Sequence, residues 1–235
     1  MLKFRNSEKT ILVTGSSSGI GKCIADTLSQ QALKIYYHGK KHHDIDLPVS
    51  GKYLFGDLSK MDDVNKIISS LNGVDIDYLI CSAGRTTLGP KQDDCLAFPS
   101  DVAHSIMDDI VFSATNICQK IVPLMIKRNF GKVFIIGGDV VDNPNQNGHM
   151  CFYGMAKAAL HQYAQNLSAY LRGLNVCVTV NVVAPTGVDK SNSQNKDCLQ
   201  RKANNKEVAE LVRHLCLMDG NYLNGQVIRF NGGKK

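Results

Sequence analysis

The sequence predicts an α/β fold in which a doubly wound parallel β-sheet carries helices on both faces. Short apolar runs alternate with longer amphipathic segments along the chain, as expected for strands joined by crossover helices. The first apolar run leads through a glycine-rich segment, TGSSSGIG (14–21), into an amphipathic one. The 235 residues suffice for one large domain, and no repeat or composition shift marks a second, so we expect a single domain over 1–235.

The strands are expected where short apolar runs stand between turn signals. The first, TILVTG (10–15), ends at a glycine. The others are KIYYHG (34–39), KYLFGD (52–57), IDYLICSAG (76–84), GKVFIIGG (131–138), VCVTVNVV (176–183) and GQVIRF (225–230).

Helices are expected between these runs. From Gly19 the apolar residues follow helical spacing, and a second helix at 61–71 has Asp62 and Asp63 in its first turn, where they favour the helix dipole. Further helices are expected at 101–129, 151–172 and 205–218. Residues 186–204 are polar and lack apolar periodicity, so we expect a substrate flap there.

Composition excludes several classes of function. The net charge of +6 comes from dispersed lysines and arginines, without the basic stripe of a nucleic-acid surface. The eight cysteines form no CxxC pair, which suits a reducing compartment, and no histidine or cysteine spacing indicates a metal site. We find no signal peptide and no apolar run near the roughly 20 residues of a membrane span, so we expect a cytoplasmic protein.

A tyrosine and a lysine, Tyr153 and Lys157, are four residues apart in the predicted helix 151–172. This spacing places both side chains on one face, about one turn apart. An ammonium near a phenol favours the phenolate, so we expect Lys157 to lower the pKa of Tyr153. The pair could then exchange a proton with a substrate oxygen, which makes both residues candidate catalytic residues.

The glycine-rich segment lies where the first strand meets the first helix. Glycines there allow a tight turn and let the backbone approach a pyrophosphate, to which the helix N-terminus offers N–H groups. We therefore expect this turn to bind a dinucleotide. The expected contributors are Gly15, Ser17, Ser18, Gly19, Ile20 and Gly21.

Together, and in this order, the motifs resemble the short-chain dehydrogenase/reductase family over nearly the whole chain. The matching segments are TGSSSGIG (14–21), Asp57-Leu58, CSAG (81–84) where the family has NNAG, YGMAK (153–157), NVVAP (181–185) and NGQVIRFNGG (224–233). The resemblance implies a Rossmann-type sheet of about seven strands, a nicotinamide cofactor and a carbonyl or alcohol substrate. The resemblance also implies cofactor contacts: Asp57 and Leu58 beside the adenine, Ala83 and Gly84 facing the ribose, Lys157 at the nicotinamide ribose, and Pro185, Gly187 and Val188 near the nicotinamide.

The end of the second strand indicates which nicotinamide cofactor is used. Enzymes that prefer NAD carry an acidic residue there for the ribose 2′-hydroxyl, whereas a basic residue accommodates a 2′-phosphate. Here the chain reads His38-Gly39-Lys40-Lys41, with no carboxylate before Asp44. We therefore expect NADP(H), with Gly39 and Lys40 at the 2′-phosphate.

The family's catalytic set of Asn, Ser, Tyr and Lys is incomplete in this chain. Aligning the strand at 131–138 puts Gly138 at the serine position, whereas counting thirteen residues back from Tyr153 gives Val140. Aligning the helix at 101–129 puts Ile110 at the asparagine position. Asp109, beside it, could take that role if the helix register shifted.

Three functions remain open. The first is an NADP(H)-dependent oxidoreductase that uses Tyr153 as acid or base, with Asp139, His149 or Ser82 orienting the substrate. The second is an NADP(H)-binding regulatory or partner subunit with little or no activity. The third is an isomerase or dehydratase. Retention of both Tyr153 and Lys157 favours an enzyme, because neither is needed to bind the pyrophosphate.

We also expect a homo-oligomer, a dimer or more specifically a tetramer, since the family pairs the helices at 101–129 and 151–172. Both helices carry apolar residues on more than one face, which would leave area for a partner. These residues are Ile106, Ile110, Ile117, Ile121, Leu160, Tyr163, Leu167 and Leu171.

Overall fold

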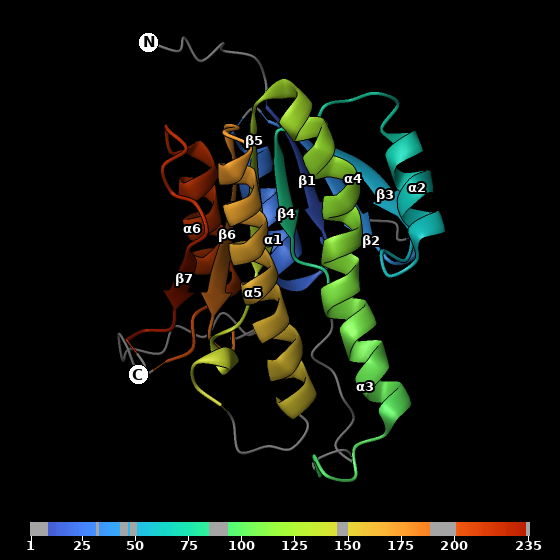
Figure 1. Cartoon of the computed structure of the whole chain (residues 1–235), viewed down its shortest axis with the longest axis vertical. Coiled ribbons are helices and arrows are strands. Elements are labelled where there is room, and N and C mark those ends of the chain that lie inside the picture. Colours follow the sequence, from blue (N-terminus) through green and yellow to red (C-terminus); the bar gives the residue numbers. More distant parts are fainter. Residues whose placement is uncertain are drawn as a thin grey trace.

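The computed structural model describes residues 9–31, 33–42, 47, 51–84, 94–144, 150–188 and 201–233. Within them the sheet has seven parallel strands in the order β3-β2-β1-β4-β5-β6-β7, which confirms the predicted Rossmann-type fold (Figure 1). The strands are β1 (Thr10–Thr14), β2 (Lys34–Gly39), β3 (Gly51–Phe55), β4 (Tyr78–Cys81), β5 (Gly131–Ile136), β6 (Val178–Pro185) and β7 (Val227–Phe230). The strand order reverses between β1 and β4, and ligands of such sheets bind outside the carboxyl ends at that point.

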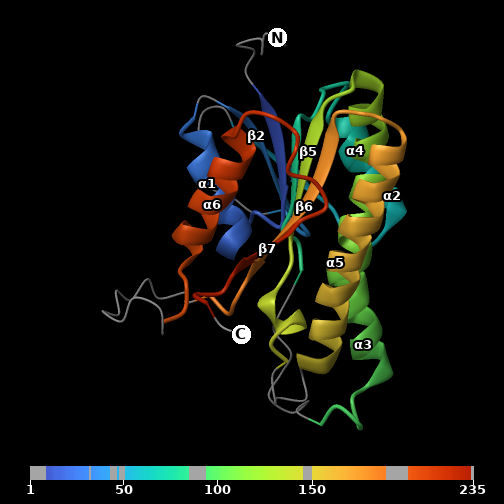
Figure 2. The ribbon, with the colours of Figure 1, turned by 60° about the vertical axis from the view of Figure 1, so that its left-hand side comes forward.

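Helices cover both faces of the sheet. On one face lie α1 (Gly19–Ser29) and α6 (Asn205–Leu217), and on the other α2 (Met61–Ser70), α4 (Ser113–Arg128) and α5 (Met150–Gly173) (Figure 2). Alternate residues of the strands enter the two cores, so that Leu12 packs with the α2, α4 and α5 side while Ile11 and Val13 pack with α1 and α6. Burial on both faces explains why the central strands are mainly apolar.

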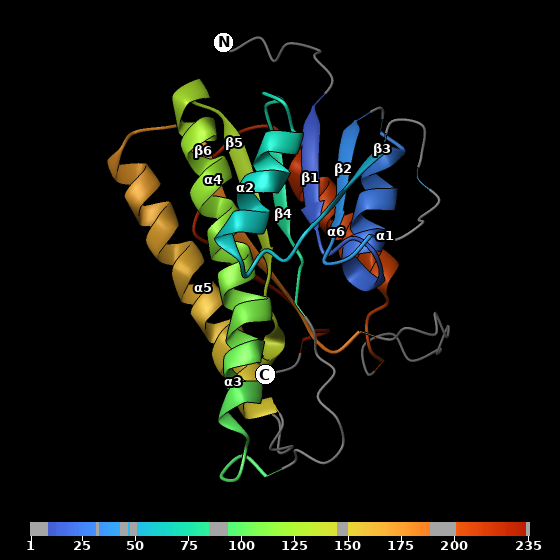
Figure 3. The same ribbon diagram turned by 90° about the vertical axis from the view of Figure 1, so that its right-hand side faces the viewer.

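The helix expected at 101–129 is interrupted. It consists of α3 (Ser100–Met107), a π-helical turn η1 (Asp108–Phe112) and α4, with α3 extending past the end of the sheet (Figure 3). A π turn inserts one residue into the helix and rotates the side chains that follow it. The apolar sequence runs through this point without a break, so periodicity alone predicted one continuous helix.

The span Ser100–Arg128 corrects our expectation that no segment could cross a membrane. Its length of 29 residues, with an 18-residue window of mean hydropathy 1.2, is enough by composition alone, but half of that window is buried inside the protein. Ile106, Ile110, Ile117 and Ile121 all belong to the core against the sheet. Such burial is also found in the core helices of soluble proteins, so the indication of a membrane span is weak.

Candidate active site

The turn between β1 and α1 packs tightly against the end of β4. Gly15 has a φ of +65°, and a Cβ there would lie 2.6 Å from the Cα of Ala83, so glycine is required. A Cβ at Gly21 would collide with the carbonyl oxygen of Gly15. The helix then begins at Gly19, and Ser18 at its N-cap makes no side-chain capping bond. A close-packed glycine turn before an uncapped helix N-terminus fits a dinucleotide pyrophosphate.

A buried histidine that the sequence did not point to joins this turn to the second strand. The Gly15 N–H donates to Nδ1 of His38 at 3.3 Å, and Nε2 of His38 lies 3.1 Å from the carbonyl oxygen of Gly56, to which it donates in the matching tautomer. Burial lowers the pKa of His38 to about 4, so the ring is neutral at pH 7. The backbone N–H of His38 also donates to Oγ of Ser16 at 2.8 Å. His38 therefore fixes the glycine turn relative to the ends of β2 and β3.

The remaining predicted residues of the turn lie next to the end of β2 and the core under α1. Ser17 is half-buried, and its Cβ would be 3.1 Å from a Cβ added to Gly39, so the turn and the end of β2 are adjacent. Ile20 packs partly against the core under α1 and α6. Thr14, the last residue of β1, accepts the backbone N–H groups of Ser82 and Ala83 at 3.1 and 3.2 Å. These bonds join β1 and β4 at the point where the strand order reverses.

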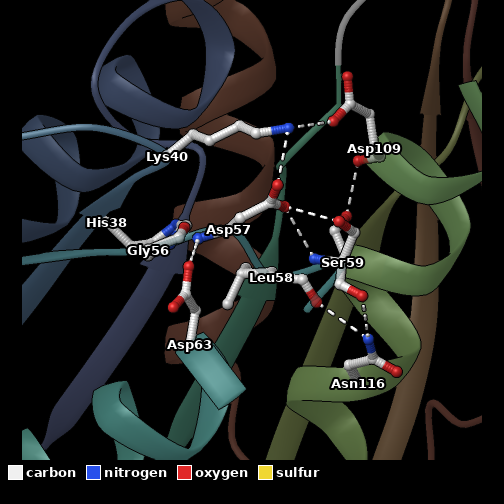
Figure 4. Close-up of polar contacts among 10 residues, drawn as sticks. His38, Lys40, Gly56, Asp57, Leu58, Ser59, Asp63, Asp109 and Asn116 are labelled. Carbon is white, nitrogen blue, oxygen red and sulfur yellow. Dashed lines mark hydrogen bonds and ion pairs between the residues drawn. The ribbon is translucent and has the colours of Figure 1, made fainter. Parts of the chain in front are cut away.

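The segment after β3, expected beside the adenine, is fixed by two helices (Figure 4). The Asp57 N–H donates to Oδ2 of Asp63 on α2 at 3.0 Å, and the Asp57 carboxylate accepts both the N–H and the hydroxyl of Ser59. From α4, Nδ2 of Asn116 donates to the carbonyl oxygens of Leu58 and Ser59 at 3.0 and 3.2 Å. No local pattern indicated that Asp63 and Asn116 support this segment, because their partners are known only once the helices are packed.

Lys40, expected at the 2′-phosphate, makes two ion pairs. Its Nζ lies 3.0 Å from Oδ2 of Asp57 and 2.9 Å from Oδ1 of Asp109 (Figure 4). Burial opposes the charge on Lys40, but its hydrogen bonds to Asp109 and Asp57 outweigh burial and raise its pKa. The ammonium therefore sits at the end of β2 as predicted, with two carboxylates as partners that the sequence did not indicate.

Tyr153 and Lys157 lie on one face of α5, as predicted, and Nζ of Lys157 is 5.5 Å from the centre of the Tyr153 ring. Nζ donates to the carbonyl oxygen of Ile136, the last residue of β5, at 2.8 Å. Burial lowers the pKa of Lys157 to about 8. Burial also raises the pKa of Tyr153 to about 12, so our expectation of a lowered value is wrong. The phenolate would lose its hydration in this site, and that loss is the cause of the raised value.

The segment after β5, where a serine was sought, runs close to Lys157. A Cβ at Gly138 would lie 3.4 Å from Cγ of Lys157 and 3.6 Å from Cγ1 of Val140, both ordinary contacts. Val140 is half-buried, and its Cγ2 would lie 3.6 Å from a Cβ at Gly154 on α5. Gly138 thus lies beside the lysine, while Val140 fills space between the segment and α5.

The carboxylate of Asp139, which we considered as a group that orients substrate, is engaged elsewhere. Its two oxygens accept bonds from Nδ2 of Asn143, and one also accepts from Nδ2 of Asn231 after β7, each at 3.0 Å. Asp139 is buried, and these bonds tie the end of β5 to the end of β7. One turn beyond Lys157, the buried His161 accepts the Gly138 N–H at 3.4 Å, a second histidine that spacing alone did not reveal.

At the position aligned with the family's asparagine, Ile110 is fully buried and packs on the glycine that ends CSAG. Its Cγ1 would be 3.1 Å from a Cβ at Gly84. Asp109, considered as a replacement for the asparagine, lies in the π turn. Its carboxylate bonds Lys40 near the end of β2 and not the Tyr153–Lys157 pair.

Pro185, the last residue of β6, is buried, and the next residue, Thr186, donates its N–H to the carbonyl oxygen of Phe230 at 3.2 Å. Gly187 is exposed, and Val188 packs against the core on the α1 and α6 side. His149 and most of the expected substrate flap (189–200) lie outside the described residues. Among the described residues no group of three or more histidine, cysteine or acidic side chains could hold a metal ion.

Comparison with known proteins finds one matching family and several similar proteins. The family described as short chain dehydrogenase matches residues 9–201. The chain is 27% identical to an uncharacterized oxidoreductase, YmfI, of Bacillus subtilis (strain 168), with 96% of this chain and 98% of the relative covered. It is 25% identical to the 3-oxoacyl-[acyl-carrier-protein] reductase FabG of Salmonella typhimurium, over 96% of both chains, and 28% identical to Nodulation protein G of Rhizobium sp. (strain N33), over 98% of both.

Proposed function

The chain belongs to the short chain dehydrogenase family, and from that premise we propose that it is an NADP(H)-dependent oxidoreductase that reduces a carbonyl or oxidises an alcohol on a small-molecule substrate. The observation that carries the proposal is the pairing of Tyr153 with Lys157 on one face of α5, beside the end of β5. We propose one domain over 1–235, in the cytoplasm, with residues 186–204 as the substrate flap.

Tyr153 is the proposed proton donor for reduction. At neutral pH a buried phenol with a pKa of about 12 is protonated and can give its proton to a developing alkoxide. Lys157 is held at the Ile136 carbonyl and carries a positive charge below about pH 8, so it stabilises the phenolate that forms. When bound, the nicotinamide supplies or accepts the hydride. Gly15, Gly19, Asp57 and the residues after β6 are the proposed contacts that hold the dinucleotide.

A screen of NADPH oxidation, followed by absorbance, tests the proposal. The panel should contain ketones, keto acids, nucleotide sugars and a 3-oxoacyl thioester, the last because the relative FabG is named as a 3-oxoacyl-[acyl-carrier-protein] reductase. Turnover of one substrate class supports the enzyme. Tight NADPH binding without turnover of any of them favours the second function below.

The second candidate function is a cofactor-binding regulatory or partner subunit of low activity. It is supported by Gly138 and Ile110, which bring no hydroxyl or amide to the two positions where the family's serine and asparagine are expected. Of the groups considered as substitutes, Asp139 is bonded to two amides. Ser82 after β4 and His149, which lies outside the described residues, remain candidates. An isomerase or dehydratase is a third candidate. It would be identified by a product that forms while the amounts of NADPH and NADP stay constant.

We predict that the protein binds NADPH more tightly than NADH and that Lys40→Ala abolishes the difference. The ammonium lies at the end of β2, and its side chain is 47% exposed, so it can exchange its carboxylate partners for a 2′-phosphate. A charge-assisted pair of this kind contributes roughly 1.5–3 kcal/mol, or about ten- to a hundredfold in affinity. Calorimetric titration with each cofactor measures it. Equal affinities for the two cofactors, or no loss in the alanine variant, would refute the choice of NADP(H).

We further propose a homo-oligomer, with a tetramer as the expected state. The apolar residues first considered are mostly buried within the chain's own core, but other residues on the outer faces of the same helices are exposed: Phe112 and Leu124 before and on α4, and Met155 and Tyr170 on α5. We predict a mass in light scattering of four times the 25.8 kDa chain, reduced by Phe112→Glu or Met155→Glu. A monomeric mass at micromolar concentration would contradict the proposal.

A further inference from the structure

A carboxylate from the π turn reaches the residue that is expected to recognise the 2′ position of the cofactor. Asp109 lies 69 positions from Lys40 in the sequence, yet its Oδ1 is 2.9 Å from the lysine Nζ. Asp57 holds the same ammonium from the other side, at 3.0 Å, so Lys40 bridges two acidic side chains from separate elements (Figure 4). Both carboxylates are largely buried, with side chains 17% and 16% exposed.

The π turn accounts for the position of this carboxylate. Ile110 points into the core and packs on Gly84, which holds the backbone of η1 against the end of the CSAG segment. The carbonyl oxygen of Asp109 would be 3.7 Å from a Cβ on Gly84, and it also accepts the hydroxyl of Ser113 at 2.7 Å. With its backbone fixed in this way, Asp109 presents its carboxylate toward the end of β2.

Lys40, Asp57 and Asp109 together carry a net negative charge, because two carboxylates face one ammonium. A 2′-phosphate that binds Lys40 must compete with Asp109 for the ammonium and approach a second negative charge. A 2′-hydroxyl carries no charge and meets neither cost, and a carboxylate can accept its hydrogen bond. Asp109 thus weakens binding of a 2′-phosphorylated nucleotide, whereas it leaves the affinity for the unphosphorylated nucleotide unchanged or raises it.

We propose that Asp109 is a specificity-determining residue that lowers the protein's preference for 2′-phosphorylated nucleotides by competing for Lys40. The inference rests on the proposed function only in placing the adenosine end of the cofactor at this site. Asp109 belongs to η1 and lies outside the segment at the end of β2 from which the choice of cofactor was predicted.

The test compares the wild-type protein with Asp109→Asn by calorimetric titration of 2′,5′-ADP and of 5′-AMP. The asparagine keeps the size of the side chain and removes its charge. We expect affinity for 2′,5′-ADP to rise roughly two- to tenfold, less at 0.5 M salt, because partly exposed charges are screened. Affinity for 5′-AMP should fall or stay the same. The matched control is Asp108→Asn, which makes the same charge change at an exposed residue of the same π turn and should alter both affinities by less than twofold.

The outcomes separate this inference from the choice of cofactor. If the wild type prefers 2′,5′-ADP and Asp109→Asn leaves that preference unchanged or lowers it, the inference is wrong while NADP(H) use stands. If the wild type prefers 5′-AMP and Asp109→Asn shifts the preference toward 2′,5′-ADP, NADP(H) use is wrong and the inference stands. An equal rise in Asp108→Asn also overturns it, because the effect would then be one of general charge. Thermal unfolding of each variant verifies that the fold is intact.

Discussion

Replacing Tyr153 with phenylalanine should slow reduction of the carbonyl substrate by about 10²- to 10⁴-fold, the range for loss of a positioned general acid. The buried phenol holds its proton at neutral pH, with a pKa near 12, and phenylalanine keeps the ring while removing that proton. Nζ of Lys157 would keep its bond to the Ile136 carbonyl, so the local packing should persist. The measurement is kcat and KM with NADPH and the substrate found by the screen.

The matched control is Tyr222→Phe, the same chemical change at a fully exposed residue between α6 and β7. It should leave turnover within twofold, since surface substitutions of this kind rarely matter. NADPH affinity should be similar in both variants. Unchanged turnover in Tyr153→Phe would show that the phenol is not the acid. That result would favour an isomerase, a dehydratase or a partner subunit as the function.

The architecture could be predicted because burial on both faces leaves a strong signal in the sequence. A strand such as β4, buried at every position, reads as an unbroken apolar run, and the glycine turn follows β1, the strand at which the strand order reverses. Boundaries were less accurate where side chains decide them. The strand predicted from residue 176 begins at Val178, because the Cys177 N–H donates to the side chain of Asn129 and not to a neighbouring strand.

The arrangement of Tyr153 and Lys157, the proposed catalytic pair, was predicted from the sequence, but the pKa shift of Tyr153 was not. Helical spacing places Lys157 beside Tyr153, but spacing says nothing about how far either group is removed from water. Burial depends on how the whole of α5 packs on β5, and it shifts the pKa of the phenol in the direction opposite to the one expected from the ammonium alone.

The contacts at the adenosine end could not be predicted from local pattern at all. Lys40 was identified from its place after β2, whereas its partner Asp109 depends on a π turn that the apolar periodicity hides. His38, Asp63 and Asn116 act through hydrogen bonds to backbone atoms of other elements, and such bonds require no characteristic residue spacing.

Adding a hydroxyl at Gly138 is the second change with a large expected effect. The residue has an extended backbone, with φ of −169°, and a Cβ there would make ordinary contacts with Lys157 and Val140, so serine fits without strain. One preorganised donor to a developing oxyanion is worth on the order of 10²- to 10³-fold in rate. We expect Gly138→Ser to recover part of this, raising kcat by roughly tenfold or more.

Two further variants make the result specific to the hydroxyl and to its position. Gly138→Ala adds the same Cβ without the donor, and it should leave kcat unchanged or lower it slightly. Val140→Ser tests the position that counting back from Tyr153 gives, but Val140 fills space against Gly154, so we expect destabilisation there and no gain in rate. A gain in Val140→Ser alone would place the missing serine at residue 140. Equal gains in Gly138→Ser and Gly138→Ala would mean that packing around Lys157, and not a missing donor, limits the rate.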